Sequence, residues 1–444
     1  MRTLPNSWFL FTLIVLALCL PSGPVYAEQQ QTLELQRLLD QAKPGDRIVL
    51  QPGTYEGPIT INKSLTLQSA EPTGEVIVRN SSEKPAITLK ADRITIAGLR
   101  IVDEAIKESA SILVLGNRSV LDRLQIRTGA HGIEAKDAHE GSVNRTTIEW
   151  AVDDVRMAEK GNGIDLFNAH RWRMTNNTIR EVHDGIYMEN SDEALVAGNV
   201  IERSRYGIHC MYTKRTVIQH NEGKLNVTGA MVMAAEQVVV TGNTFSKQSE
   251  NVNSQGVLLY DAHETMVSDN KIDGNRVGLY VEQSTANRVE RNQVGYNFVG
   301  IQLLESSENT ITSNQFLGNV TDAQARDSDN NTIASNYWDS FRGIDTNGDG
   351  NSEISYAINP FFQGLTRKRA AFQLFFQSPG MVFLEGLYQT ERIRWTTDSS
   401  PLMRPHANFI QTGQRVDKLK TGLTGLLLIA CASLLFYKMR RQKI

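Results

Sequence analysis

Apolar and polar residues recur along this chain with a period of 22 residues. Each repeat is marked by a glycine, replaced by aspartate in the last copy, and by an asparagine fourteen residues later. The markers are Gly163, Gly185, Gly207, Gly229, Gly256, Gly278, Gly300 and Asp322, followed by Asn177, Asn199, Asn221, Asn243, Asn270, Asn292, Asn314 and Asn336. One interval is 27 residues long, which predicts a five-residue insertion between Ser246 and Gln255. A fixed period of this length indicates a solenoid.

Each repeat begins with alternating apolar and polar residues, the pattern of a half-buried β-strand. In the third copy Ile208 and Cys210 alternate with His209 and Met211, so the first pair should face inward. A further apolar residue eleven positions after each glycine predicts a second inward strand, and the Asn, Ser and Asp residues between the strands are typical of tight turns. We therefore predict an all-β fold, a right-handed, single-stranded parallel β-helix with rungs of about 22 residues.

Stacking of the rungs would give the recurring asparagine a structural role. Equivalent residues of neighbouring rungs should lie ~4.8 Å apart, and asparagines at this spacing can form a hydrogen-bonded ladder. The open ends of such a stack need caps. We expect a short amphipathic helix at 33–42 to close the N-terminal end. A helical segment between 361 and 395, divided by Pro379 and Gly380, should cap the other end or dock a partner.

The sequence then divides into six segments. The predicted segments are a signal peptide (1–27), an N-terminal cap with the first rungs (28–80), the parallel β-helix (81–340), a calcium-type loop with a C-terminal cap or docking segment (341–410), a transmembrane helix (421–437) and a cytoplasmic tail (438–444). The signal peptide is predicted because an apolar run at 8–20 follows Arg2 and precedes a small-x-small cleavage pattern ending at Ala27. An uncleaved anchor and a lipoprotein modified at Cys19 are the alternatives.

The second apolar run, at 421–437, carries no charge and is followed by four basic residues. At ~1.5 Å per residue it is just long enough to cross the hydrocarbon core of a bilayer. Basic residues favour the cytoplasmic side, so the bulk of the chain should lie outside the cell membrane. The exported part then contains one cysteine, Cys210, which excludes an intramolecular disulfide. A net charge of -3 gives no basic footprint for a nucleic acid.

Two adjacent rungs carry an unusual set of outward side chains. His209 and Met211 lie two and four residues after one marker glycine, and Met231 and Met233 occupy the same positions of the next rung. Alternate residues of a strand are ~6.5 Å apart and neighbouring strands ~4.8 Å apart, so the four side chains can converge on one ion. Thioethers and imidazole are soft ligands that suit Cu(I). The alternative is that these methionines pack beneath a loop or a partner helix.

A loop of calcium-binding type follows the last rung. Asp345, Asn347, Asp349 and Asn351 match positions 1, 3, 5 and 7 of the twelve-residue calcium loop, with Gly350 at position 6. The twelfth position is not an acid, which excludes an EF-hand. We expect calcium here, with a metal-free turn as the alternative.

Several of these segments resemble the NosD family. The rung at 207–213 (GIHCMYT) is similar to one in which a His and a Met of that family flank an aromatic residue. The segments that look like the family's tail, in the same order, are 336–339 (NYWD), Gly343, 345–350 (DTNGDG), 378–379 (SP) and 401–405 (PLMRP). The resemblance covers roughly residues 30–406. The tail motifs joined to the His/Met rung are far more specific than the repeat.

Resemblance to this family implies an exported accessory protein for nitrous oxide reductase, in the periplasm or at the cell surface. Such proteins are expected to act with the permease and ATPase subunits of an ABC transporter, and with a copper chaperone lipoprotein, in assembling the copper–sulfide centre of the reductase. Their cargo would be copper or, alternatively, sulfur. By position, the leading copper-handling residues become His209, Met211, Met231 and Met233, with Met403 and His406 as a second pair. The resemblance therefore implies a protein that is not an enzyme, whereas the membrane anchor is predicted from the apolar run at 421–437.

The chain departs from the family in two respects, and two other functions stay open. Cys210 stands where an aromatic residue is common, and the C-terminal anchor is not general in the family. A polysaccharide lyase or hydrolase would need carboxylates ~5–10 Å apart in a groove. Asp165, Glu189 and Glu282 face outward but are expected on rungs that are not adjacent, and the corner at His183-Asp184 is interpreted as a turn. A glycan-binding solenoid would favour Trp and Tyr on its outward face.

Overall fold

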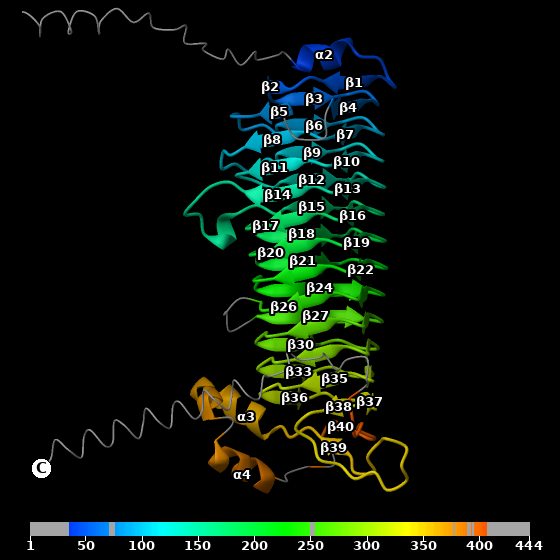
Figure 1. The fold of residues 1–444 in the computed structure, drawn as a ribbon, viewed down its shortest axis with the longest axis vertical. Helices are drawn as coiled ribbons and strands as arrows, with labels where there is room; N and C mark the ends of the chain where they lie inside the picture. The colour runs from blue at the N-terminus through cyan, green and yellow to red at the C-terminus, as the bar shows by residue number, and fades with distance from the viewer. Residues whose placement is uncertain are drawn as a thin grey trace, which may run out of the picture.

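The computed structural model describes residues 35–70, 76–248, 254–375, 378–388, 392 and 395–405. These residues wind into a parallel β-solenoid of the right-handed type, with about 13 turns (Figure 1). The predicted all-β solenoid with rungs of about 22 residues is confirmed. Within the described ranges no helix is long and apolar enough to cross a membrane. The predicted signal peptide (1–27), transmembrane helix (421–437) and cytoplasmic tail (438–444) lie outside them.

Three sheets run the length of the solenoid, and each rung contributes one strand to each sheet. The twelve-stranded sheet contains β3 (Ile59–Ile61), β6 (Ile87–Leu89), β9 (Ile112–Val114), β12 (Ile133–Lys136), β15 (Ile164–Phe167), β18 (Asp184–Glu189), β21 (Tyr206–Met211), β24 (Thr228–Glu236), β27 (Gln255–His263), β30 (Val277–Glu282), β33 (Val299–Leu304) and β36 (Thr321–Arg326). The thirteen-stranded sheet contains β2 (Gly53–Glu56), β5 (Val76–Arg79), β8 (Arg100–Asp103), β11 (Gln125–Thr128), β14 (Thr147–Trp150), β17 (Thr178–Arg180), β20 (Val200–Glu202), β23 (Glu222–Lys224), β26 (Thr244–Ser246), β29 (Lys271–Asp273), β32 (Gln293–Gly295), β35 (Gln315–Leu317) and β38 (Tyr337–Trp338). The fifteen-stranded sheet contains β1 (Arg47–Leu50), β4 (Thr66–Ser69), β7 (Thr95–Ala97), β10 (Val120–Asp122), β13 (Ser142–Asn144), β16 (Arg173–Thr175), β19 (Leu195–Ala197), β22 (Val217–Gln219), β25 (Val239–Thr241), β28 (Met266–Ser268), β31 (Arg288–Glu290), β34 (Thr310–Thr312), β37 (Thr332–Ala334), β40 (Thr397–Asp398) and β39 (Tyr356–Ala357).

The rung has three strands where the sequence pattern predicts two. The strand that alternation misses belongs to the thirteen-stranded sheet, as in β17 and β20. It is only three residues long and has a single buried apolar residue, such as Ile179 or Ile201, between two half-buried ones. A run this short shows no periodicity, so the sequence gives it no strand signal.

The recurring asparagines form the predicted ladder at one corner of the rungs from Asn177 to Asn336. Asn221 donates its backbone N–H and its side-chain amide to Asn243 Oδ1, at 2.9 and 3.0 Å. Asn243 makes the same two bonds to Asn270 Oδ1, both at 2.9 Å. These side chains are buried, so the ladder pairs backbone groups at a turn that water cannot reach.

A second ladder stands at the next corner and was not foreseen from the sequence. Asn226 donates its backbone N–H to Gln248, Gln248 donates to Asn275, and Asn275 donates to Asn297. The longer side chain of Gln248 occupies the position that Asn226 and Asn275 hold in the two neighbouring rungs. The predicted insertion follows it, since β26 and β27 flank the long interval.

Both ends of the solenoid are covered. Helix α2 (Leu35–Gln41) lies within the predicted helical segment and buries Leu35 and Leu39 on the first rung. Gln36 bonds the backbone of Thr60 through both atoms of its amide, which occupies the edge of β3. At the other end Asp398 Oδ2 accepts the last bonds of the asparagine ladder and so terminates it.

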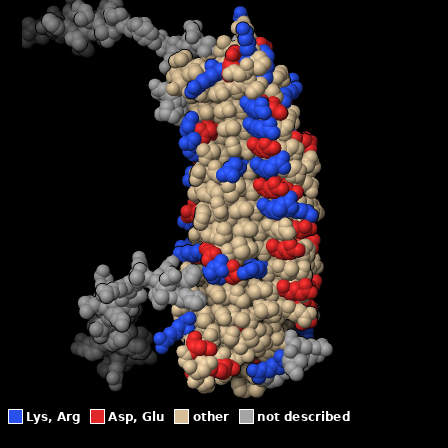
Figure 2. Space-filling model, turned by 90° about the vertical axis from the view of Figure 1, so that its right-hand side faces the viewer, with Lys and Arg blue, Asp and Glu red and all other residues tan. Residues whose placement is uncertain are grey.

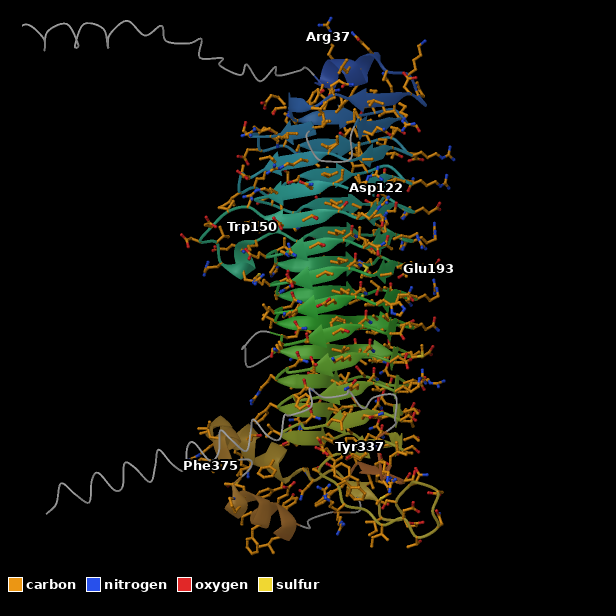
Figure 3. The ribbon with its side chains drawn as sticks, viewed as in Figure 1. Arg37, Asp122, Trp150, Glu193, Tyr337 and Phe375 are labelled. Atoms are coloured by element: carbon orange, nitrogen blue, oxygen red, sulfur yellow. The ribbon has the colours of Figure 1, made fainter. Side chains whose placement is uncertain are left out.

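The helices beyond the last rung lie to one side of the solenoid (Figure 1). They are α3 (Phe361–Lys368), the 3-10 turn η2 (Ala370–Phe375) and α4 (Pro379–Leu387), and a further turn, η1 (Met157–Glu159), lies between β14 and β15. Helix α4 begins at the predicted break, where Ser378 accepts a hydrogen bond from the Met381 N–H. Phe375, labelled in Figure 3, is 52 % exposed on this helical segment.

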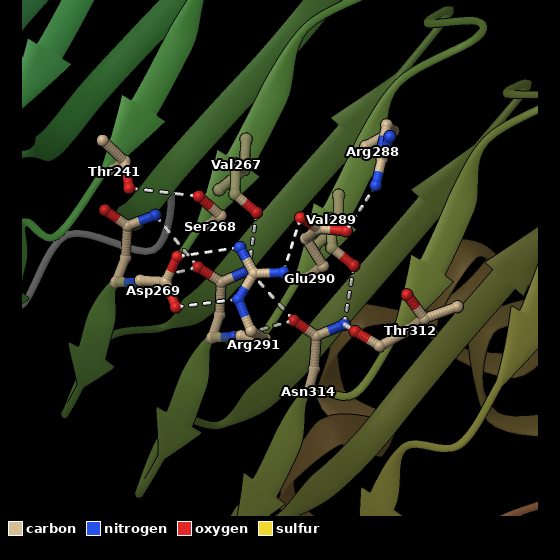
Figure 4. A network of polar contacts seen from close by, with 12 residues as sticks. Thr241, Val267, Ser268, Asp269, Arg288, Val289, Glu290, Arg291, Thr312 and Asn314 are labelled. Atoms are coloured by element: carbon tan, nitrogen blue, oxygen red, sulfur yellow. Dashed lines mark hydrogen bonds and ion pairs between the residues drawn. The ribbon is translucent and has the colours of Figure 1, made fainter.

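Charged side chains line the turn side of the fifteen-stranded sheet. Figure 2 shows basic and acidic groups alternating along this side, and Asp122 and Glu193 mark it in Figure 3. Arg291 is a typical member, because it bonds both oxygens of Asp269 at 3.0 Å and Glu290 at 2.6 Å (Figure 4). Exposed pairs of this kind each contribute only ~0–1 kcal/mol. The alternation avoids like-charge contacts between stacked rungs.

Candidate functional site

The four predicted copper ligands lie together on the twelve-stranded sheet, whose labels run down the middle of Figure 1. Strands β21 and β24 pair in parallel, with His209 opposite Met231 and Met211 opposite Met233. Neighbouring strands in such a sheet are ~4.8 Å apart. The structure therefore brings all four residues to one patch, in the register that the repeat predicts.

The four side chains point away from the solenoid core, but they are more buried than an outward face suggests. His209 is 5 % exposed and Met231 9 % exposed, while Met211 and Met233 are half-buried. An outward direction therefore does not leave His209 and Met231 open to solvent. The cause at His209 is two aromatic neighbours, because the rings of Tyr187 and Tyr206 each lie 4.9 Å from the imidazole ring.

The imidazole of His209 is held by the carboxylate of Asp184, a residue that the sequence pattern assigns to a turn. His209 Nδ1 lies 3.0 Å from Asp184 Oδ2. Arg205 donates to both oxygens of the same carboxylate, at 2.8 and 2.6 Å, and the Tyr206 N–H donates to it at 3.3 Å. Asp184 is only 1 % exposed. Burial raises the pKa of its carboxyl, but the bonds from His209 and Arg205 outweigh this and lower the pKa to about 2.

The other ring nitrogen of His209 has no hydrogen-bond partner among the described residues, although it is buried. Buried side-chain nitrogens are nearly always paired, so an unpaired one needs an explanation. A metal ion is one such partner, since histidine binds metals through one nitrogen while the other donates to a carboxylate or carbonyl.

Tyr187, on the preceding rung, contacts the sulfur of Met211. The hydroxyl of Tyr187 donates to Glu189 Oε2 at 2.7 Å and lies 3.5 Å from Met211 Sδ. Burial and the Glu189 carboxylate raise the pKa of Tyr187, so the phenol stays protonated. The same Tyr–Glu pair recurs at Tyr280 and Glu282, at 2.9 Å, outside the His/Met rungs.

Cys210 is not part of this patch. Its thiol faces the core, as the alternation predicts, and is 0 % exposed. Burial raises the pKa of the thiol to about 12, so it is neither ionised nor accessible. The thiol of Cys210 therefore adds no soft ligand to the outer face.

Asp184, which the repeat pattern did not predict as part of the site, left a weak signal in the sequence. Asp184 directly precedes a marker glycine, and the other rungs have no acid at this position. The strand ladder passes from Asp184↔Tyr206 to Ile186↔Ile208 without pairing the intervening glycine. Alternation is therefore interrupted, and Asp184 lies on the same side as His209 rather than in the core. It belongs to β18 and not to a turn.

Two carboxylates lie closer together than the sequence interpretation held. Asp165 is on β15 and Glu189 is on β18, and these strands pair directly. The expectation that these acids occupy non-adjacent rungs is wrong for this pair, because their marker glycines are one repeat apart. Both carboxylates are engaged in bonds, Asp165 with Asn162 at 2.7 Å and Glu189 with Tyr187 at 2.7 Å.

The calcium-type loop follows the last rung and is largely exposed. Asp345 accepts hydrogen bonds from the N–H groups of Gly348 and Gly350, at 2.6 and 3.0 Å. Asp349 accepts from the Asn351 N–H, which lowers the pKa of the Asp349 carboxyl. Across the described residues, no three His, Cys, Asp or Glu side chains are placed to hold one ion. Calcium at this loop stays a prediction.

Met403, one residue of the predicted second copper-handling pair, does not lie near His209. Met403 donates its backbone N–H to Gly350 at 3.0 Å, at the C-terminal end of the solenoid. His406 lies outside the described residues. The structure therefore places Met403 beside the calcium-type loop, beyond the last rung, whereas His209 lies on β21.

A family model matches the central part of the chain. Residues 144–352 match the family described as periplasmic copper-binding protein (NosD), which confirms the resemblance seen in the motifs. The matched range contains all four candidate copper ligands and Asp184. Among curated proteins, none matches the chain.

Solved structures show the same fold in proteins of different kinds. The A-module of Azotobacter vinelandii mannuronan C-5 epimerase AlgE6 is 16% identical, with a TM-score of 0.52 over 69% of this chain and 90% of that chain. Gene product 12 of bacteriophage phi29, in its pre-mature form, is 10% identical, with a TM-score of 0.53 over 68% of this chain and 53% of that chain. At such low identity these likenesses establish the fold alone.

Proposed function

We propose that this chain, a member of the NosD family, is a non-enzymatic accessory protein that binds Cu(I) outside the cell membrane. Its copper ligands would be His209, Met211, Met231 and Met233. It would act with the permease and ATPase subunits of an ABC transporter, and with a copper chaperone lipoprotein, in assembling the copper–sulfide centre of nitrous oxide reductase. A C-terminal membrane anchor would hold it beside that transporter.

One observation carries the copper site. The register of β21 and β24 sets an imidazole opposite one thioether and a second thioether opposite a third. The imidazole also offers a buried nitrogen that has no hydrogen-bond partner among the described residues. Soft ligands select Cu(I) over hard cations such as calcium or magnesium. The family description supports copper, and the four residues lie within the matched range.

The test is an anaerobic titration of the full chain with Cu(I) in competition with a chromogenic Cu(I) chelator. The test variant carries Ala at His209, Met211, Met231 and Met233. The matched control carries Ala at His263 and Met266, which also combine an imidazole and a thioether but lie on different sheets. Tight binding of one Cu(I) should be lost in the test variant and kept in the control. Equal stoichiometry and affinity in all three proteins would overturn the proposed site.

A polysaccharide lyase or hydrolase is the second candidate, because Asp165 and Glu189 lie on adjacent strands of the same face. Paired carboxylates at a spacing of ~5–10 Å serve glycosidases. Both acids already make hydrogen bonds within the protein, which disfavours a catalytic role. Incubation of the chain with pectin and with alginate, followed by analysis of chain length and unsaturated ends, separates the two functions. Degradation would favour the polysaccharide enzyme.

A further inference from the structure

We infer that Asp184, held in place by Arg205, is a positioning residue that fixes the tautomer of His209 and so makes Nε2 the copper-binding atom. The inference rests on the proposed copper site and adds two residues outside the ligand set. It concerns how the apo protein prepares one ligand, which can be observed before any metal is added.

The carboxylate of Asp184 has no freedom to rotate away from the imidazole. Arg205 Nε and Nη2 donate one hydrogen bond to each of its two oxygens, and the Tyr206 N–H donates a third. Bidentate pairs of this kind fix geometry as well as charge. The guanidinium also stacks on the Tyr206 ring, at 4.3 Å from the ring centroid. The carboxylate is therefore a rigid acceptor aimed at His209 Nδ1.

A rigid, ionised acceptor decides where the imidazole proton sits. A carboxylate without a proton can only accept hydrogen bonds, so Nδ1 must carry the hydrogen across the 3.0 Å contact with Asp184. In the neutral ring Nε2 then holds a lone pair. That atom is buried and has no partner among the described residues, on a residue whose strand neighbour is Met231. Carboxylate, imidazole and metal in this order is a recurrent arrangement at histidine metal sites.

A second Asp–His pair on the same face lacks these properties and serves as the control. His131 Nδ1 lies 3.2 Å from Asp165 Oδ2. The same nitrogen lies 3.1 Å from the Asn162 N–H, which needs an acceptor. The two contacts demand opposite roles of one atom, so this pair does not fix a tautomer. No methionine lies on β12, which follows His131, or on β15, which contains Asp165.

Exchanging the carboxylate for an amide should reverse the tautomer. In Asp184→Asn the amide oxygen should stay with the cationic Arg205, which leaves the amide NH2 group facing His209 Nδ1. Nδ1 must then accept, and the ring proton moves to Nε2. A protonated Nε2 cannot bind Cu(I) without losing that proton. Loss of an outer-shell partner of this kind typically costs 10–100-fold in metal affinity.

The experiment measures the tautomer and the affinity in the same full-chain proteins. Protonation of each ring nitrogen is determined by NMR of ¹⁵N-histidine-labelled apo protein, with the His209 signals assigned from a His209→Gln variant. Cu(I) affinity is measured by chelator competition. The wild type and Asp165→Asn should carry the proton on Nδ1 of His209 and bind Cu(I) equally. Asp184→Asn should carry it on Nε2 and bind about 10–100-fold more weakly. Arg205→Gln keeps the carboxylate, so it should keep the Nδ1 proton with a smaller loss of affinity.

Each outcome decides a different point. A proton on Nε2 in the wild type overturns the inference without any metal. Unchanged affinity in Asp184→Asn, when the wild type binds, also overturns it and leaves the proposed function standing. A wild type with the Nδ1 proton but no Cu(I) binding overturns the proposed function instead. If Asp184→Asn does not fold, as judged by its thermal unfolding, the wild-type tautomer and Arg205→Gln still decide.

Discussion

Replacing Asn243 by alanine tests whether the asparagine ladder holds together the two rungs that carry the copper ligands. Asn243 Oδ1 accepts the backbone N–H and the side-chain amide of Asn221, at 2.9 and 3.0 Å. Its own amide donates to Ile218 O at 3.0 Å and to Asn270 Oδ1 at 2.9 Å. Alanine removes these four bonds and a fifth, from the same amide to Thr241 O at 3.1 Å. Asn221 is 2 % exposed, so water cannot reach its N–H group as a substitute.

The magnitude follows from what remains unpaired. A buried backbone N–H without a partner costs ~1–3 kcal/mol, and each further lost bond contributes ~1 kcal/mol. Not every lost bond leaves a group fully unpaired, because the Asn221 amide still reaches Val196 O and Gln219 O. The free energy of unfolding should therefore fall by about 2–5 kcal/mol. The matched control is Glu222→Ala, an exposed strand residue one position after Asn221, which should change it by less than ~0.5 kcal/mol.

The assay is chemical denaturation followed by far-UV circular dichroism, together with hydrogen exchange resolved to single amides. Rungs of a solenoid contact only their neighbours, so the loss of protection should centre on Asn221 and fade within a rung or two. A stability within ~1 kcal/mol of the control would refute the reasoning. So would an unchanged protection of the Asn221 amide, because the ladder would then not be its hydrogen-bond acceptor.

The remaining predictions concern the groups around the site. The pKa of the Asp184 carboxyl is lowered from 3.8 to about 2, so this group stabilises the fold above pH ~4 and the stabilisation is lost as the pH falls toward 2. When the free energy of unfolding is measured against pH, the acid-induced decrease should be smaller by about 2 kcal/mol in Asp184→Asn than in the wild type. Tyr187→Phe removes the hydroxyl beside the methionine sulfur and should weaken Cu(I) binding by about 2–10-fold, whereas Tyr280→Phe, its structural twin, should leave the affinity unchanged in the same chelator assay. Cys210 should resist alkylation in the folded protein at pH 8 and react after denaturation, as read by peptide mass spectrometry, and an exposed, reactive thiol would contradict its place in the core. If the calcium-type loop binds its ion, millimolar calcium should raise the thermal midpoint over that in EDTA, and Asp345→Ala should abolish the shift; no shift in the wild type would dismiss calcium.

The sequence predicted the features that repeat and missed those that occur once. Gly207 and Asn221 recur at fixed intervals, so columns of equivalent residues gave the rung length, the register and the inward Asn ladder. Those columns also set His209 beside Met231, because register follows from the period alone. Asp184 was missed because the unpaired glycine after it breaks the alternation that assigns sides. Its contact with His209 joins two rungs and leaves no trace in the spacing of either.

The burial of the site also could not be predicted from the alternation of apolar and polar residues. Alternation states whether a side chain faces into or out of the solenoid, but not what lies over it. Tyr187 and Tyr206 enclose His209 through ring positions that depend on side-chain rotamers. The sequence therefore located the candidate ligands but gave neither the depth of the imidazole nor its unpaired nitrogen.

The contacts described for the site lie within three consecutive strands, β18, β21 and β24, and Arg205, which directly precedes β21. Elsewhere in the solenoid, each rung makes the same hydrogen bonds to its neighbours, so one rung can take the place of another. A duplication or loss of 22 residues away from these strands would lengthen or shorten the molecule by ~4.8 Å and leave the site unchanged. Evolution can therefore adjust the height of the site above the C-terminal end in whole steps, independently of its chemistry. Homologues with different numbers of rungs would reveal whether that height is under selection.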